Sequence, residues 1–159
     1  MTQFDFQDNQ LKLKVRRSPI IILSILYLIT ILCFALPLSG FVLSVISGAG
    51  IKFGGLIAIG VFSLLGFYML RLALWNHRGE EIIRFRNDEI SYIADYRYFR
   101  DGKKSIRRNE ISYSVCPVGY EEENVGVLII SNGESEIASV VKMPRNNIEK
   151  LIELLENAG

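Results

Sequence analysis

Charged side chains are nearly absent from a long stretch in the first half of this 159-residue chain. Between Arg17 and Arg71 the only one is Lys52. A helix buried in a soluble protein rarely stays uncharged for so long, which argues against an ordinary soluble domain. Because no acidic or histidine side chain lies within the stretch, the sequence gives no sign of a proton relay or an ion path.

The chain also has only two cysteines and one histidine. Cys33 lies in the uncharged stretch and Cys116 in the polar half, so we expect two unpaired thiols rather than a disulfide framework. Neither cysteine has a Cys or His neighbour at the spacing of a metal site. Since a phosphate-binding loop motif is absent too, the sequence lacks the converging groups of an active site. We therefore predict that the protein is not an enzyme and binds no metal and no cofactor.

What the first half does contain is two long apolar runs, Pro19–Gly40 and Phe53 to about Trp75. Each reaches the roughly 20 residues that a membrane-spanning helix needs. Lipid offers the backbone no hydrogen-bond partners, so both runs should be helical and form a transmembrane hairpin over residues 18–78. Pro37 should kink or end the first helix. Residues 41–50 should then either prolong that helix or lie along the far membrane surface.

Basic residues flank the apolar runs on one side. Lys12–Arg17 precedes the first run, Arg71, His77 and Arg78 follow or end the second, and the connection holds only Lys52. Positive residues stay on the cytoplasmic side of a membrane. We therefore predict a multi-pass protein of the inner (cytoplasmic) membrane with both termini in the cytoplasm, and residues 1–17 as a cytoplasmic N-terminal segment.

The end of the second run should lie at the membrane–water interface, where Arg side chains snorkel and Trp side chains gather. The residues predicted to lie there are Arg71, Trp75, Asn76 and His77. His77 is expected to be an interfacial residue, with a proton-sensing or ligand-binding role as the alternative.

After Arg78 the hydrophobic pattern alternates with a period of two, which is typical of half-buried antiparallel strands. The expected strands are residues 80–87, 89–100, 109–118, 125–131 and 135–143. Asn87-Asp88, Asp101-Gly102 and Asn132-Gly133 are turn signals between them, so each strand should be connected to the next by a hairpin.

The period changes again in residues 145–159, where apolar residues share one helical face. These residues are Ile148, Leu151, Ile152, Leu154 and Leu155. Residues 79–159 should therefore form a cytoplasmic α+β domain. We predict an antiparallel sheet or roll of five to seven strands closed by a C-terminal amphipathic helix, which a small sheet needs to complete its core.

This layout, with the Trp75-Asn76 pair inside "RLALWNHRGEEI", resembles the bacterial pleckstrin-homology-like membrane proteins. It is also similar to the photosystem I assembly factor family, which has two spans and a "WN" pair before a sheet. The resemblance covers about residues 18–158. It implies a non-enzymatic, membrane-anchored interaction domain with a PH-like fold, and it does not imply photosynthesis.

A cluster of basic residues in "YRYFRDGKKSIRR" is the strongest candidate binding site. Its members are Arg97, Arg100, Lys103, Lys104, Arg107 and Arg108. Such clusters beside a membrane are typical of contacts with anionic lipids. The alternatives are a solvated hairpin that protects a strand edge, protein docking, and nucleic-acid binding.

The charge of the polar half disfavours nucleic acid. From Gly79 to Gly159 there are 11 Lys and Arg against 15 Asp and Glu. A general nucleic-acid binder needs the opposite balance. The acidic triplet Glu121–Glu123 is expected to be a solvated loop, with metal or partner binding as the alternative.

We therefore expect an accessory or assembly subunit that binds another membrane protein or complex through its cytoplasmic domain. The alternative is a membrane sensor that binds anionic lipid headgroups, and a membrane-embedded enzyme is a remote third. The protein should not bind nucleic acid, and it could form a homo-oligomer.

Overall fold

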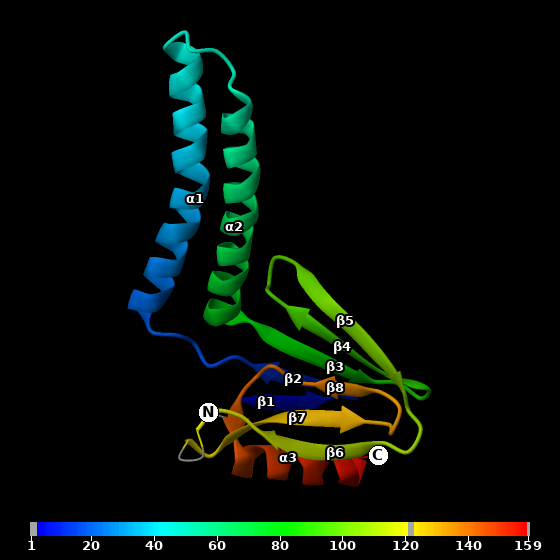
Figure 1. The fold of residues 1–159 in the computed structure, drawn as a ribbon. Coiled ribbons are helices and arrows are strands. Elements are labelled where there is room, and N and C mark those ends of the chain that lie inside the picture. Colours follow the sequence, from blue (N-terminus) through cyan, green and yellow to red (C-terminus); the bar gives the residue numbers. More distant parts are fainter. Residues whose placement is uncertain (1–2, 121–122, 159) are drawn as a thin grey trace. The chain divides into compact units, whose positions relative to one another are not determined.

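The computed structural model of the chain describes residues 3–120 and 123–158. It divides into two compact units (Figure 1). A helical unit runs from Arg17 to His77, and a sheet unit combines the chain up to Arg16 with the chain from Arg78 onward. This confirms the predicted fold class, a pair of long apolar helices followed by an α+β arrangement. The sheet unit takes its strands from both sides of the helices.

The helical unit consists of α1 (Ile20–Ile46) and α2 (Phe53–Arg78). Both helices are long and apolar enough to cross a membrane. Pro37 lies inside α1 and does not end it. The helix continues beyond Gly40 to Ile46, which agrees with the first of the two alternatives for residues 41–50. A proline removes only one backbone hydrogen bond, which the many remaining turns of a long helix tolerate.

Close contact between α1 and α2 depends on Gly66. A Cβ atom at this position would lie 2.7 Å from Cε2 of Phe34 and 3.1 Å from Cβ of Cys33. By contrast, a Cβ atom at Gly60 would meet nothing within 4 Å. Small residues allow helices in membranes to approach closely, and here Gly66 has that role.

The larger sheet has five antiparallel strands in the order β1-β2-β3-β4-β5. They are β1 (Phe4–Gln7), β2 (Gln10–Lys14), β3 (Glu80–Phe85), β4 (Glu89–Asp95) and β5 (Arg100–Arg107). The strand that precedes α1 therefore pairs with the strand that follows α2. The predicted Asn87-Asp88 turn is present, because the N–H of Arg86 donates to the carbonyl of Glu89 at 2.9 Å.

The N-terminal hairpin β1–β2 was not predicted from the sequence. Its turn residues Asp8 and Asn9 have φ angles of 49° and 57°. Two successive residues with positive φ are typical of the tight hairpin turn that matches strand twist. The signal was present, since apolar residues alternate with polar ones on both sides of this turn. Leu11 and Leu13 are fully buried, so the hairpin belongs to the core of the sheet unit.

The smaller sheet is centred on β7 (Val125–Ser131). This strand pairs with β6 (Ser112–Pro117), β8 (Glu136–Ala138) and β9 (Met143–Pro144). The expected series of successive hairpins is thus wrong at one step, because β5 and β6 lie in different sheets. Residues 135–143 also form two short strands rather than one. Between them, Ser139 bonds back to Leu128 through its N–H and its hydroxyl, which interrupts the regular ladder.

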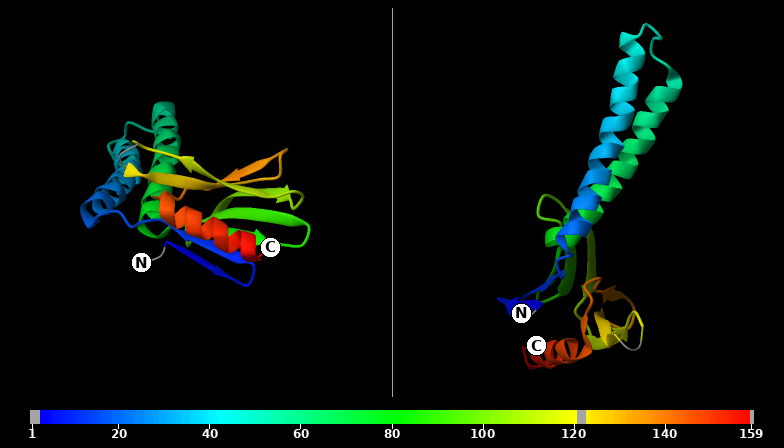
Figure 2. Two further views of the ribbon diagram at one scale, coloured as in Figure 1. Left: turned by 90° about the horizontal axis from the view of Figure 1, so that it is seen from below. Right: turned by 90° about the vertical axis from the view of Figure 1, so that its left-hand side faces the viewer.

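Helix α3 (Arg145–Ala158) packs against β6, β7 and β9 of the smaller sheet (Figure 1 and Figure 2). Ile148, Leu151 and Leu155 are buried, as the apolar stripe predicts. Leu154, which the sequence pattern placed in the same stripe, is 44% exposed, so the prediction was wrong for that residue. The helix therefore completes the core of the sheet unit.

A buried carboxyl group links the two sheets. Glu81 on β3 is fully buried, and its Oε1 accepts hydrogen bonds from the hydroxyl of Tyr92 at 2.9 Å and from the N–H of Val140 at 2.6 Å. Val140 lies between β8 and β9, so this contact crosses from the larger sheet to the smaller one. Burial raises the pKa of Glu81 above its ordinary value, and these hydrogen bonds offset the shift only in part. Burial and the nearby Glu81 carboxyl likewise raise the pKa of Tyr92.

Candidate functional site

The turn between β4 and β5 does not lie where the sequence analysis expected it. Strand β4 ends at Asp95 and β5 begins at Arg100, so Asp101 and Gly102 lie within β5. The carboxylate of Asp95 explains the earlier turn, since it accepts hydrogen bonds from the N–H of Arg97 at 2.7 Å and from Nε of Arg100 at 2.8 Å. Such aspartate–backbone bonds stabilise turns.

Gly102 has a different role from the one predicted. Tyr92 pairs with Lys104 and Ala94 pairs with Asp101, so Ile93 alone faces two residues of β5. Gly102 has a φ angle of 67°. This is a β-bulge, in which glycine supplies the positive φ that other residues adopt at a cost. A turn signal and a bulge signal share this residue type, which is why the sequence did not separate them.

Because of this geometry the six basic residues do not converge on one site. Arg97 and Arg100 lie at the β4–β5 turn, whereas Arg107 ends β5 and Arg108 follows it. Seven residue steps along a strand separate Arg100 from Arg107 by roughly 23 Å. The predicted cluster is therefore a ribbon with two ends and not a single binding pocket.

The lysines in the middle of this ribbon have a structural explanation, and at its far end the backbone is held by hydrogen bonds. Lys103 and Lys104 are exposed on β5, which is an edge strand with a bulge. Lysines and bulges both prevent edge strands from pairing with other chains. At the far end, the carbonyl of Arg107 accepts a hydrogen bond from Asn132 at 3.2 Å, and the N–H of Arg108 donates to the carbonyl of Asp88 at 3.0 Å.

Arg97 and Arg100 lie at the other end, beside exposed aromatic surface, and the guanidinium of Arg100 is paired there with the carboxylate of Asp95. Tyr98 is 78% exposed at the tip of the turn. In the same turn, the rings of Tyr96 and Phe99 stack with centroids 4.7 Å apart. The strand expected over residues 89–100 included Tyr98, but β4 ends at Asp95 and the chain turns before that residue. The turn thus presents one tyrosine and two arginines to the surroundings.

The predicted interface residues at the end of α2 hold the two helices together at the open end of the helical hairpin. The hydroxyl of Ser18 donates to Oδ1 of Asn76 at 3.0 Å, and its N–H donates to the carbonyl of the same residue at 3.2 Å. Nδ1 of His77 lies 3.2 Å from the hydroxyl of Tyr27. Asn76 and His77 therefore tie α2 to the start of α1. Ser18 and Tyr27 were not singled out from the sequence, because their partners lie far along the chain.

Arg71 and Trp75 are half-buried near the same end of α2. Their position agrees with the sequence pattern that assigned them to the membrane interface, and that assignment remains a prediction.

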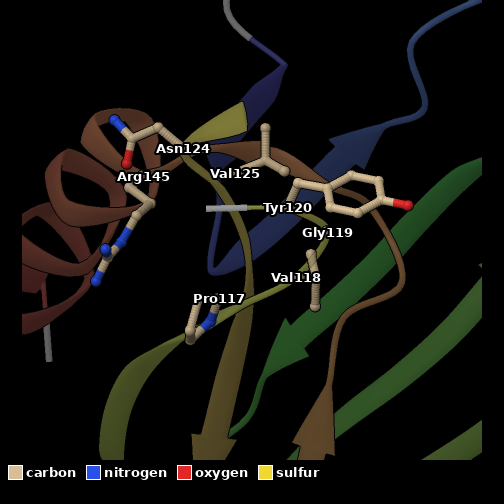
Figure 3. Close-up of a pocket in the computed structure, with 7 residues that line it drawn as sticks. All are labelled: Pro117, Val118, Gly119, Tyr120, Asn124, Val125 and Arg145. Atoms are coloured by element: carbon tan, nitrogen blue, oxygen red, sulfur yellow. The ribbon is translucent and has the colours of Figure 1, made fainter. Parts of the chain in front are cut away.

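A hollow of about 400 Å³ lies between the β6–β7 connection and the start of α3 (Figure 3). Its lining residues are Pro117, Val118, Gly119, Tyr120, Asn124, Val125 and Arg145. The hydroxyl of Tyr120 and the guanidinium of Arg145 point away from one another, so the polar end groups do not converge. Of the predicted acidic triplet in this connection, Glu121 and Glu122 lie outside the described residues.

No protein-family model matches the sequence. The resemblance to pleckstrin-homology-like membrane proteins therefore remains a prediction from the sequence layout.

Proposed function

We propose that the protein is a non-enzymatic, membrane-anchored interaction protein, an accessory or assembly subunit that binds another membrane protein or complex. The surface of the helical unit supports this proposal. Its helices expose large apolar side chains along their length, including Ile21 at 74%, Leu43 at 65% and Leu64 at 76%. Contiguous apolar surface of this kind is stable only against lipid or a protein partner.

The arrangement of the sheet unit supports a same-side topology. Strand β2 precedes both helices, strand β3 follows both, and the two strands are paired over five residues. The two segments therefore occupy one compartment, and two crossings of the membrane allow this. The basic flanks favour the cytoplasm as that compartment.

Accessibility labelling tests this topology in intact cells. A single cysteine replaces either Ser47 after α1 or Ser135 in the β7–β8 turn, with Cys33 and Cys116 changed to alanine. We expect an impermeant thiol reagent to label position 47 and to spare position 135. The opposite result would invert the topology.

Purification from native membranes in mild detergent tests the interaction. We expect another membrane protein to co-purify in a constant ratio and to capture this chain when it is itself tagged. A matched pair of variants locates the surface. Lys103→Gln with Lys104→Gln changes β5, whereas Lys142→Gln with Lys150→Gln removes the same charge elsewhere on the sheet unit. A chain that always elutes alone or only with lipid would contradict the proposal.

The second candidate function is that of a sensor for anionic lipids. The observation that favours it is the β4–β5 turn, where Arg97 and Arg100 flank an exposed tyrosine. Binding to anionic lipid should weaken as salt rises, because exposed charges are screened over roughly 8–10 Å at physiological ionic strength. A partner that stays bound at high salt favours the first function.

A further inference from the structure

The β4–β5 turn is held by several hydrogen bonds and presents an exposed aromatic side chain. Arg97 adopts a φ angle of 76°, which non-glycine residues rarely adopt. Asp95 stabilises this conformation through its bonds to Arg97 and Arg100, and the N–H of Tyr96 donates to the carbonyl of Phe99 at 3.0 Å. Strained, over-determined turns of this kind are typical of functional positions.

The place of the turn within the larger sheet suggests what it meets. Strand pairing puts Lys14, Glu80, Asp95 and Arg100 in one row across β2, β3, β4 and β5. This row ends the sheet, and the turn extends beyond it. The chain leaves the same end of the sheet after Lys14 to form α1 and returns to it from α2 before Glu80.

Covalent reach keeps this end of the sheet near the helix termini. Six residue steps lead from Lys14 to Ile20, where α1 begins, and an extended chain covers at most about 22 Å over that stretch. Only Gly79 separates Arg78, the last residue of α2, from Glu80, the first residue of β3. If the helices cross a bilayer as proposed above, these short connections let the row and its turn reach the lipid headgroups.

The side chains of the turn are suited to the lipid headgroup layer. Tyrosine is enriched at membrane–water interfaces because its ring is apolar and its hydroxyl polar. Arginine binds phosphate through several N–H donors at once. A largely exposed tyrosine between two arginines therefore fits the headgroup layer of an anionic membrane better than it fits water.

We infer that the turn from Tyr96 to Arg100 lies in the headgroup layer of the membrane that holds the helices. Tyr98 enters the interface, and Arg97 binds anionic lipid phosphates together with the Nη groups of Arg100, whose Nε is paired with Asp95. The inference rests on the proposed membrane span. The turn gives the sheet unit an attachment to the membrane in addition to its two covalent connections, and so limits the orientations that the unit can adopt.

Depth-dependent fluorescence quenching of the full chain in liposomes tests this. Single-cysteine variants carry an environment-sensitive label, with Cys33 and Cys116 changed to alanine and the quencher placed in the lipid headgroup region. Tyr98→Cys reports on the turn. Tyr120→Cys is the matched control, because Tyr120 is 81% exposed in the β6–β7 connection. We expect quenching several times stronger at position 98 than at position 120, and equal quenching would overturn the inference.

Changing the lipid composition tests whether the positive charges of the turn bind anionic lipid. Quenching at position 98 should be stronger with phosphatidylglycerol present than with phosphatidylcholine alone. Arg97→Gln should remove this difference, and Lys103→Gln, which removes one positive charge from β5, should leave it intact. Equal quenching on both lipid compositions, or an equal effect of the two variants, would contradict the assigned role of the arginines.

A third label separates this inference from the proposed membrane span. Leu64→Cys places the label on an exposed position of α2, where a quencher in the lipid acyl chains should reach it. Quenching at position 64 without quenching at position 98 would overturn only the contact of the turn. Absence of quenching at position 64 would overturn both the span and the turn contact. A label at position 98 that neither a lipid-borne nor an aqueous quencher reaches would overturn the inference and assign the turn to a contact between copies of this chain instead.

Discussion

The N-terminal hairpin should determine whether the sheet unit folds. Leu11 and Leu13 on β2 are fully buried, whereas Lys12 is half-buried and Lys14 is exposed. Changing a buried leucine to alanine destabilises a protein by about 2–5 kcal/mol. Changing both should therefore remove about 4–10 kcal/mol from a total free energy of unfolding of about 5–15 kcal/mol. The double variant should be largely or fully unfolded.

The structure shows how to measure this without the membrane helices. The N–H of Val15 donates to the carbonyl of Gly79 at 3.0 Å, so the chain ends on either side of the helices are adjacent. A short Gly/Ser linker can therefore replace residues 17–77 and join Arg16 to Arg78. We call the product the linked sheet unit. Thermal unfolding followed by circular dichroism gives its Tm.

Leu13→Ala alone should lower the Tm of the linked sheet unit by at least about 8 °C, because each 1 kcal/mol shifts Tm by about 4–8 °C in a unit of this size. Lys12→Ala is the control, and exposed or half-exposed substitutions of this kind usually stay within about 0.5 kcal/mol. A fragment that begins at Gly79 should fail to fold, since it lacks β1 and β2. Equal Tm values for the leucine and lysine variants, or cooperative unfolding of the shorter fragment, would refute the reasoning.

Three further predictions concern other parts of the core. Gly66→Ala should weaken the α1–α2 contact because its Cβ would meet Phe34, whereas Gly60→Ala should be neutral or stabilising; thermal unfolding of the full chain in detergent distinguishes them. Leu151→Ala should destabilise the linked sheet unit by about 2–5 kcal/mol and the exposed Leu154→Ala far less, as denaturant unfolding would show. Because the pKa of Glu81 is raised, its carboxyl group holds a proton more tightly in the folded state than in the unfolded state. Protonated Glu81 therefore stabilises the fold fully below about pH 4.5, and this stabilisation is lost as the pH rises through the folded-state pKa. Glu81→Gln should flatten that pH dependence of the denaturant midpoint, and the partly exposed Glu80→Gln should leave it unchanged.

Sequence patterns predicted the elements that depend on local signals. The two apolar helices follow from run length and missing charge, and α3 follows from a stripe with a helical period. The Asn87-Asp88 turn follows from residues that favour tight turns. In each case the residues that form the element also contain the information that defines it.

The candidate site was predicted only in part, because a cluster in sequence is not a cluster on a strand. The basic segment from Tyr96 to Arg108 is continuous in sequence, but in the structure it extends along the whole of β5 and beyond both ends of that strand. The exposed position of Tyr98 depended on where the chain turned, and Asp95 set that position through its hydrogen bonds. Those bonds are invisible in a pattern of apolar and polar residues.

Local sequence patterns did not predict the pairing of β2 with β3, for a different reason. The alternation around Asp8 and Asn9 is a local signal, but a two-stranded hairpin is marginally stable by itself. It becomes part of a core only when Leu11 meets Ile83, more than 70 residues later in the chain. During synthesis the first hairpin therefore waits until α2 has emerged before the larger sheet can form. Such non-local contacts are slow to form because the intervening chain must first be closed into a loop. The basic segment Lys12–Arg17 thus has two roles, as the last part of a strand and as the flank of a helix, and the sequence analysis recognised only the second.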